Sequence, residues 1–154
     1  GQILDQGVQI NLTADYRAIT WLRNNIVGAP TLAETPTTIY RWGGRISVYT
    51  GLPSLIAWDW HAKQQHWGYA HEVEARFNDA RELFTTRNVQ RAATLLSTLG
   101  VELIYVGELE RALYPAEALA KFDRMKAMGV HAIYRDGTTV IYRLSKDFQL
   151  PPVG

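Results

Sequence analysis

The sequence predicts a single α/β domain of three-layer type, with a mixed sheet that ends in an antiparallel hairpin. Helical segments with one apolar face alternate with short apolar runs that are typical of buried strands. One such run, Val101 to Val106, is apolar throughout except for Glu102 and fits a central strand. Near the end of the chain, Asp136-Gly137 separates two apolar runs, and this dipeptide favours a two-residue hairpin loop. Because hairpin strands are antiparallel, the sheet must be mixed.

Length and composition exclude several classes of protein. The 154 residues suffice for one domain with a sizeable core, and 47% hydrophobic and 20% charged residues exclude bulk disorder. The net charge of +1 and the lack of a recognition motif argue against a nucleic-acid partner. Cysteine is absent, which excludes disulfides and thiolate metal sites. No apolar run approaches the roughly 18 residues needed to cross a bilayer.

The chain divides into a domain and two flanking segments. Residues 13–147 form the α/β domain, and residues 148–154, which contain Pro151 and Pro152, form a C-terminal tail. Residues 1–12 are polar, and we interpret them as a linker from an upstream membrane region. The chain is therefore expected to be a piece of a longer protein.

The first half of the domain is predicted to contain one helix and three short strands. Thr13 is a suitable N-cap for a helix over residues 14–26, which Gly28 and Pro30 end. Residues 31–34, 45–49 and 54–58 have the composition of strands, with turn residues at 50–53 between the last two.

The second half is predicted to contain three helices, the central strand and the hairpin. A charged helix covers residues 72–84, and Asn88 caps a second helix that Gly100 ends. A third helix has Pro115 near its first turn, ends at Gly129 and buries Leu119, Phe122 and Met125. In the hairpin, Asp136 and Gly137 as loop residues would pair Arg135 with Thr138, Ile133 with Val140, and His131 with Tyr142.

An aromatic cluster follows the strand predicted at residues 54–58. Trp58, Trp60 and Trp67 lie within ten residues of one another, interleaved with His61 and Gln65. Tryptophan rings that stack on a sugar, together with amides that bind its hydroxyls, would form a carbohydrate site. Core packing is the alternative, and it is favoured for Trp58.

Metal ligation and an anion site are two further interpretations of this region. His61, His66 and His71 are spaced by five residues, which does not put them on one helical face, so no metal site and no cofactor are expected. Arg45 and Arg76 flank the cluster, and guanidinium groups suit phosphate or carboxylate. Surface salt bridges are the more frequent role of such residues. A serine nucleophile motif is missing, which argues against an autonomous enzyme.

Two sets of residues occur in an order that is typical of a known family. The first is Gly44-Arg45-Ile46-Ser47-Val48-Tyr49-Thr50-Gly51-Leu52-Pro53, followed by Trp58, His61, Gln65 and Trp67. The second comprises Arg76, Asp79, Tyr105-Val106-Gly107, Glu110-Arg111, Tyr114 and Lys121-Phe122. In these residues, from about Ala14 to Phe122, the chain resembles the YYY family of large bacterial and archaeal membrane proteins. It departs from the family's Trp-Arg-Gly motif, because Trp67 is followed directly by Gly68.

The resemblance implies a function for the chain as part of a larger protein. The family looks like GT-C glycosyltransferases, with many membrane helices and a C-terminal domain on the extracytoplasmic side of the cell membrane. The catalytic carboxylates of that class lie in loops among the membrane helices, so no catalytic residue is expected here. The expected partners are the upstream transmembrane region and a lipid-linked sugar or glycan. The predicted substrate-binding residues are Arg45, Trp60, His61, Gln65, Trp67 and Arg76. The alternative is a structural module that docks on its own membrane helices or on a partner protein.

Overall fold

A computed structural model describes residues 2–5, 8–11, 13–36, 45–55 and 67–148. A four-stranded sheet lies at its centre, with strands in the order β3 (Leu32–Ala33), β4 (Leu103–Val106), β6 (Thr139–Leu144) and β5 (Val130–Asp136). β3 pairs with β4 in parallel, whereas β6 is antiparallel to both of its neighbours. The predicted α/β fold with a mixed sheet is therefore confirmed.

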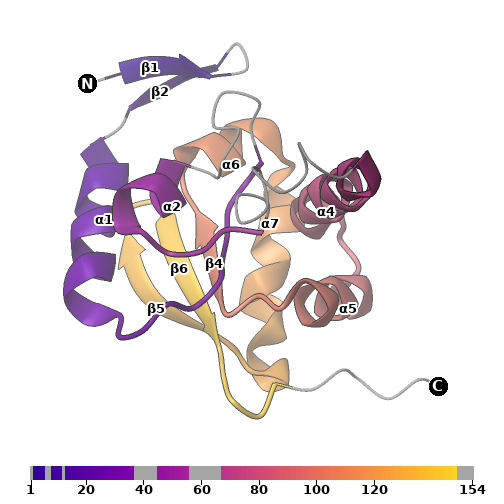
Figure 1. The fold of residues 1–154 in the computed structure, drawn as a ribbon. Coiled ribbons are helices and arrows are strands. Elements are labelled where there is room, and N and C mark those ends of the chain that lie inside the picture. Colours follow the sequence, from indigo (N-terminus) through magenta and orange to yellow (C-terminus); the bar gives the residue numbers. More distant parts are fainter. Residues whose placement is uncertain (1, 6–7, 12, 37–44, 56–66, 149–154) are drawn as a thin grey trace.

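Helices cover both faces of this sheet (Figure 1). On one face, α1 (Thr13–Asn25) and α2 (Arg45–Thr50) bury Leu22 and Ile46 against Tyr105 of β4. On the other face lie α4 (Trp67–Thr85), α5 (Val89–Leu99), α7 (Ala116–Ala120) and the 3-10 helix η2 (Lys121–Met128). Phe84 and Phe122 meet edge to face in this second core. The two apolar clusters account for the three layers, because a sheet buried on both faces needs helices on both.

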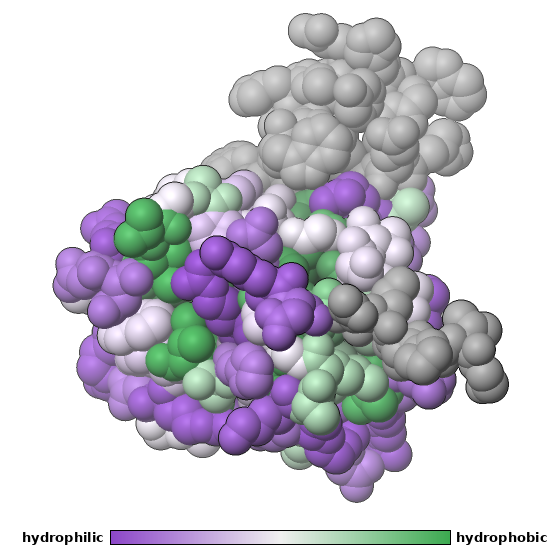
Figure 2. Space-filling view, turned by 90° about the horizontal axis from the view of Figure 1, so that it is seen from below, coloured by the Kyte–Doolittle hydropathy of each residue, from purple (hydrophilic) through white to green (hydrophobic). Residues whose placement is uncertain are grey.

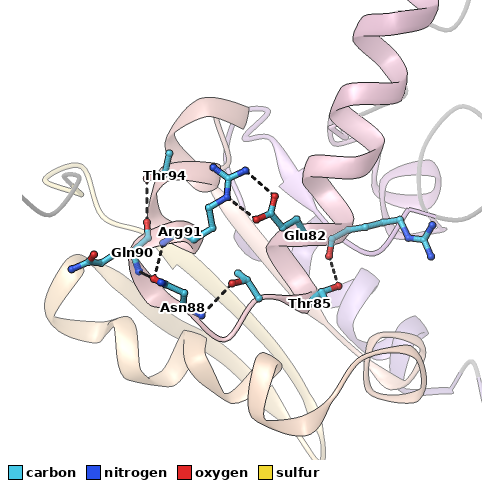
Figure 3. A network of polar contacts seen from close by, with 8 residues as sticks. Glu82, Thr85, Asn88, Gln90, Arg91 and Thr94 are labelled. Carbon is cyan, nitrogen blue, oxygen red and sulfur yellow. Dashed lines mark hydrogen bonds and ion pairs between the residues drawn. The ribbon is translucent and has the colours of Figure 1, made fainter. Parts of the chain in front are cut away.

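Polar contacts fix the corner between α4 and α5 (Figure 3). The Asn88 side chain accepts hydrogen bonds from the backbone N–H groups of Gln90 and Arg91, which caps α5 as predicted. Arg91 donates from Nε and Nη2 to the two carboxylate oxygens of Glu82, at 2.7 and 2.8 Å. This bidentate pair connects the last turns of α4 to the first turn of α5.

The strand predicted at residues 45–49 is wrong, because these residues form the helix α2. The carboxylate of Glu34 accepts hydrogen bonds from the N–H groups of Ile46 and Ser47, at 3.1 and 2.9 Å. These are two of the four backbone donors that have no partner at a helix start, and a carboxylate there also suits the helix dipole. Gly51, at φ +77°, follows the helix. The strand predicted at 54–58 is described only at its start, where Ser54 forms a parallel bridge to Leu32.

The segment after β4 contains more helices than predicted. The additional helix α6 (Glu108–Leu113) comes first, and Pro115 then starts α7 with φ −61°. The predicted burial of Leu119, Phe122 and Met125 is confirmed, as is the end of this segment at Gly129, which has φ +105°. α6 was not predicted because it is only six residues long.

The hairpin is present, but its predicted register is wrong. Asp136 pairs with Thr139, which leaves Gly137 and Thr138 as the loop residues, and Arg135 pairs with Val140. The Asp136 carboxylate binds Arg17 of α1 and accepts a hydrogen bond from the Tyr134 hydroxyl, so Asp136 belongs to the strand rather than to the loop. A bulge between Ala132 and Tyr134 shifts the remaining pairs once more.

Residues interpreted as a linker form a hairpin of their own. β1 (Gln2–Asp5) and β2 (Val8–Asn11) pair in antiparallel fashion, apart from the main sheet, and β2 contacts α6. In the part of the chain that the structure describes, no helix is both long and apolar enough to span a membrane.

Candidate functional site

The carboxyl ends of β3 and β4 lie side by side, and we call this end of the sheet the carboxyl edge. Glu34 directly follows β3, and Gly107 directly follows β4. Open α/β sheets bind ligands outside the carboxyl ends of their parallel strands. The bridge from Ser54 to Leu32 is also parallel, so the chain runs toward the same edge at Leu55. The tryptophan-containing segment begins directly after Leu55.

Two buried glutamates at this edge bind backbone amides. Besides Glu34, which anchors the start of α2, Glu110 of α6 is completely buried. Its Oε1 accepts from the N–H of Gly107 at 2.8 Å, and its Oε2 accepts from the N–H of Thr35 at 2.9 Å. One carboxylate therefore joins the chain just after β4 to the chain just after β3. Charge-assisted hydrogen bonds of this kind are about twice as strong as neutral ones.

Aromatic hydroxyls extend this buried polar network. The Tyr114 hydroxyl lies 2.5 Å from Oγ1 of Thr35, and burial raises the pKa of Tyr114 above its ordinary value. The Tyr105 hydroxyl donates to the carboxylate of Asp15, at the start of α1. A Cβ atom at Gly107 would lie 2.7 Å from Cε1 of Tyr105, so only glycine fits beneath this ring. The network thus connects β4 to α1 and leaves no room for a side chain at Gly107.

Arg76 fixes the point from which the tryptophan segment departs. It lies on α4, is half-buried, and donates from Nε to the carbonyl oxygen of Leu55 at 2.6 Å. Leu55 itself is buried in the core beneath α4. The chain is therefore held in place at Leu55, and it is described again from Trp67, where α4 starts.

The structure describes the predicted substrate-binding residues only in part. Trp60, His61 and Gln65 lie outside the described residues, as do Trp58 and His66. Arg45 and Trp67 are described as the first residues of α2 and α4, respectively. Arg76 is the predicted residue whose contacts can be followed, and it binds a main-chain carbonyl. Within the described ranges, no three His, Cys, Asp or Glu side chains are grouped so as to hold a metal ion.

The described part of the carboxyl edge is suited to positioning rather than to reaction. Glu34 and Glu110 both use their carboxylate oxygens on backbone N–H groups, and Asp15 accepts from a tyrosine. Carboxylates held in this way orient loops and helix ends. Their effect is to hold together the chain just after β3, the start of α2 and the chain just after β4.

The chain shares its fold with a domain of an oligosaccharyltransferase. The similar structure is the C-terminal globular domain of that enzyme from Archaeoglobus fulgidus. The match has a TM-score of 0.53 and 14% sequence identity, and it covers 88% of this chain and 100% of that domain. At this identity the likeness concerns the fold alone. No protein-family model matches the chain, and no curated protein matches it.

Asp15, Glu34 and Glu110 were not predicted as members of a site, although the sequence contains one signal for them. Glu110 follows Gly107 by three residues, which is the spacing of a capping box, and the structure forms the half of that box in which the Glu110 carboxylate accepts from the Gly107 N–H. The Tyr105-Val106-Gly107 and Glu110 motif therefore has a structural explanation in this chain: it joins two strand ends.

Proposed function

We propose that this chain is the extracytoplasmic C-terminal domain of an integral-membrane glycosyltransferase of the GT-C type. In this proposal it contacts the sugar or the lipid phosphate of a substrate and does not catalyse transfer. The observation that carries the proposal is the hydrogen bond from Arg76 to Leu55, which fixes the chain at the carboxyl edge directly before the tryptophan-containing segment of the sequence. The shared fold with an oligosaccharyltransferase domain and the resemblance to the YYY family support the same function.

Each predicted residue has a role in this proposal. Trp60 and Trp67 stack on sugar rings, because the apolar face of a sugar matches an aromatic platform. His61 and Gln65 bind sugar hydroxyls. Arg45, the first residue of α2, and Arg76, in the middle of α4, supply positive charge for a phosphate. The catalytic carboxylates belong to the membrane portion of the protein.

A fluorescence titration tests the proposal. The 154-residue chain is titrated with a short-chain polyprenyl-phosphate oligosaccharide while tryptophan emission is followed. We expect a saturable change that disappears in Trp60→Phe and Trp67→Phe. Trp21→Phe is the matched control, because Trp21 packs on Tyr134 with ring centroids 5.1 Å apart and belongs to the α1 side of the sheet.

The alternative, a module that docks on membrane helices or a partner, predicts a different result. In that case no saturable change occurs with the lipid-linked oligosaccharide or with free oligosaccharide. A change that persists in both Trp60→Phe and Trp67→Phe would also contradict the assigned residues.

A further inference from the structure

The outer strand of the sheet, β5, has a hollow beside it. β5 is the last strand in the order of the sheet, and within the described ranges it pairs with β6 alone. The 3-10 helix η2 packs along β5, and the hollow between them, which we call the η2–β5 groove, has a volume of about 270 Å³. Pockets for small molecules measure roughly 300–1,000 Å³, so this groove suits a single side chain. The lining residues used below are Phe122, Asp123, Lys126, Ala132, Arg135 and Tyr142.

The side chains of the η2–β5 groove converge from one face of the sheet and from the helix above it. On β5, Ala132 pairs with Tyr142 and Arg135 pairs with Val140. Both β6 partners belong to the larger core, on the face that η2 covers, and cross-strand partners share a face. Two hydrogen bonds close the gap to η2, because Nη2 of Arg135 and the Tyr142 hydroxyl both donate to Oδ1 of Asp123, at 2.8 and 3.0 Å. Between them, Ala132 presents only a methyl group, which leaves the hollow open.

The charges that line the η2–β5 groove favour an anion. Its carboxylate, Asp123, is already bound by Arg135 and Tyr142. Arg135 uses Nη2 for this bond, so its Nε and Nη1 donors remain for another acceptor. In the part of the chain that the structure describes, the exposed ammonium of Lys126 makes no hydrogen bond and no ion pair. Two cations therefore line the groove beside one carboxylate.

The outer edge of β5 offers backbone hydrogen bonds next to the groove. The N–H of Leu144 donates to the carbonyl of Glu102, on the β4 side, so Leu144 does not bond to Val130, its partner on β5. Bonded and non-bonded pairs alternate along antiparallel strands, so Ala132 also directs its N–H and carbonyl away from β6. Ala132 is exposed. One ligand can therefore reach both this backbone and the groove.

We propose that β5 and the η2–β5 groove bind a short extended segment of a partner protein that carries an aspartate or a glutamate. The segment adds to β5 as a further strand through the backbone of Ala132, which is a recurrent mode of peptide recognition. Its acidic side chain enters the groove, where Arg135 and Lys126 bind the carboxylate. This inference uses no residue of the carboxyl edge and does not rest on the proposed function.

Two further observations favour a short polar segment over other occupants. The bulge between Ala132 and Tyr134 interrupts regular pairing, which disfavours a long strand such as that of a second copy of the chain. Figure 2 shows the molecule from below, and hydrophobic residues form separate small patches among hydrophilic ones on this face. A broad apolar interface is therefore not expected there.

Fluorescence anisotropy of a labelled peptide tests the proposal on the 154-residue chain. The probe is a fluorescein-labelled heptapeptide of alternating threonine and valine with one central glutamate, and we expect saturable binding. Replacing the glutamate by glutamine should weaken binding by about tenfold or more, because a charge-assisted hydrogen bond contributes that factor. N-methylation of the glutamate and of both neighbouring threonines keeps the charge but removes the N–H donors, and it should abolish binding.

Matched variants locate the site. Lys126→Gln should weaken binding severalfold, and Ala132→Leu should abolish it by filling the hollow. Lys146→Gln, the same change at an exposed lysine outside the groove, should leave the affinity unchanged. Thermal unfolding confirms that each variant is folded.

Four results would overturn the proposal. They are no binding of the glutamate peptide, equal binding of the glutamine peptide, equal binding of the N-methylated peptide, and equal affinity in Lys126→Gln and Lys146→Gln. A dimer of the chain that is lost in Ala132→Leu would assign the edge to a second copy instead. Because no variant touches residues 45–76, failure here leaves the proposed function unaffected.

Discussion

Lys121, the first residue of η2, is fully buried although lysine is ordinarily charged. Its Nζ donates to the carbonyl of Ala118 at 2.7 Å and lies 4.2 Å from the centre of the Phe122 ring. Burial, assisted by the positive charge of Arg124, lowers the pKa of Lys121 from 10.5 to about 7. The folded protein therefore disfavours a proton that the unfolded chain retains.

The buried lysine makes the stability of the protein depend on pH. Between the folded pKa of about 7 and the unfolded value of 10.5, the unfolded chain binds the extra proton. The free energy of unfolding therefore rises with pH across this range, and the gain is lost as pH falls toward 7. We expect Lys121→Met to raise the free energy of unfolding at pH 7 by roughly 1–2 kcal/mol, because it removes an amine that is costly to bury. Urea denaturation at pH 7 and pH 9.5 measures both effects.

The decisive comparison is between the two pH values. In the wild type, stability should increase from pH 7 to pH 9.5, and in Lys121→Met this increase should be smaller. Parallel changes in the two proteins would show that Lys121 titrates normally. Lys126→Met, which removes an exposed positive charge of the same helix, is the control.

Glu34 is the residue on which α2 depends. Glu34→Ala leaves the N–H groups of Ile46 and Ser47 without their carboxylate acceptor in a buried site. We expect a loss of about 2–3 kcal/mol in the free energy of unfolding. Glu117→Ala should cost less than about 0.5 kcal/mol, because Glu117 forms an exposed pair with Arg87 at 3.0 Å. Similar losses in the two variants, measured by urea denaturation, would show that α2 does not rely on this cap.

At the scale of elements, two glycines illustrate two different requirements. Gly137, in the hairpin loop, has φ +61° and open space around its α-carbon. Gly107, after β4, has an ordinary φ of −119°, but a side chain there would collide with Tyr105. Position 137 requires a residue that adopts positive φ, and position 107 requires a residue without a side chain.

These requirements predict opposite responses to substitution. At Gly137, asparagine should be tolerated better than alanine, because asparagine adopts positive φ more readily, and alanine should cost roughly 1 kcal/mol. At Gly107, alanine should cost about 1–3 kcal/mol and asparagine more, because each added atom worsens the overlap. Thermal unfolding of the four variants gives the two rankings. The same ranking at both positions would contradict this explanation.

Elements with local signals could be predicted from the sequence, and elements that depend on distant partners could not. α5 carries its own cap in Asn88 and its own stop in Gly100, so its limits were predicted correctly. α2 has a strand-like composition, and its cap comes from Glu34, which lies before it and outside it. The hairpin was predicted from Asp136-Gly137, but Asp136 lies in the strand, where it binds Arg17, which is 119 residues away. Caps and turn residues close in the sequence therefore indicated that an element is present. Its type or its exact pairing involves contacts with residues outside it.

At the scale of the whole molecule, the carboxyl edge shows the same division. The segment with the tryptophans was recognisable from composition alone. The buried polar network of the edge was not, because its hydrogen bonds join residues 75 and 90 positions apart, Thr35 to Glu110 and Asp15 to Tyr105. Only folding brings these buried polar groups together. The order of strands, with β6 inserted between β4 and β5, likewise follows from tertiary pairing.

The proposed function requires that Trp60, His61, Gln65 and Trp67 contact substrate and are not part of the core. The most direct measurement is the rate of sugar transfer by the full-length protein carrying His61→Ala or Trp67→Ala, at matched amounts of folded protein. We predict a severalfold loss of transfer. The free energy of unfolding of the 154-residue chain, measured by urea denaturation, should change by no more than about 1 kcal/mol. Trp21→Ala should show the reverse: lost stability from the emptied contact with Tyr134, and normal transfer per folded molecule. Transfer at the wild-type rate in both His61→Ala and Trp67→Ala, or unfolding of both, would contradict the claim.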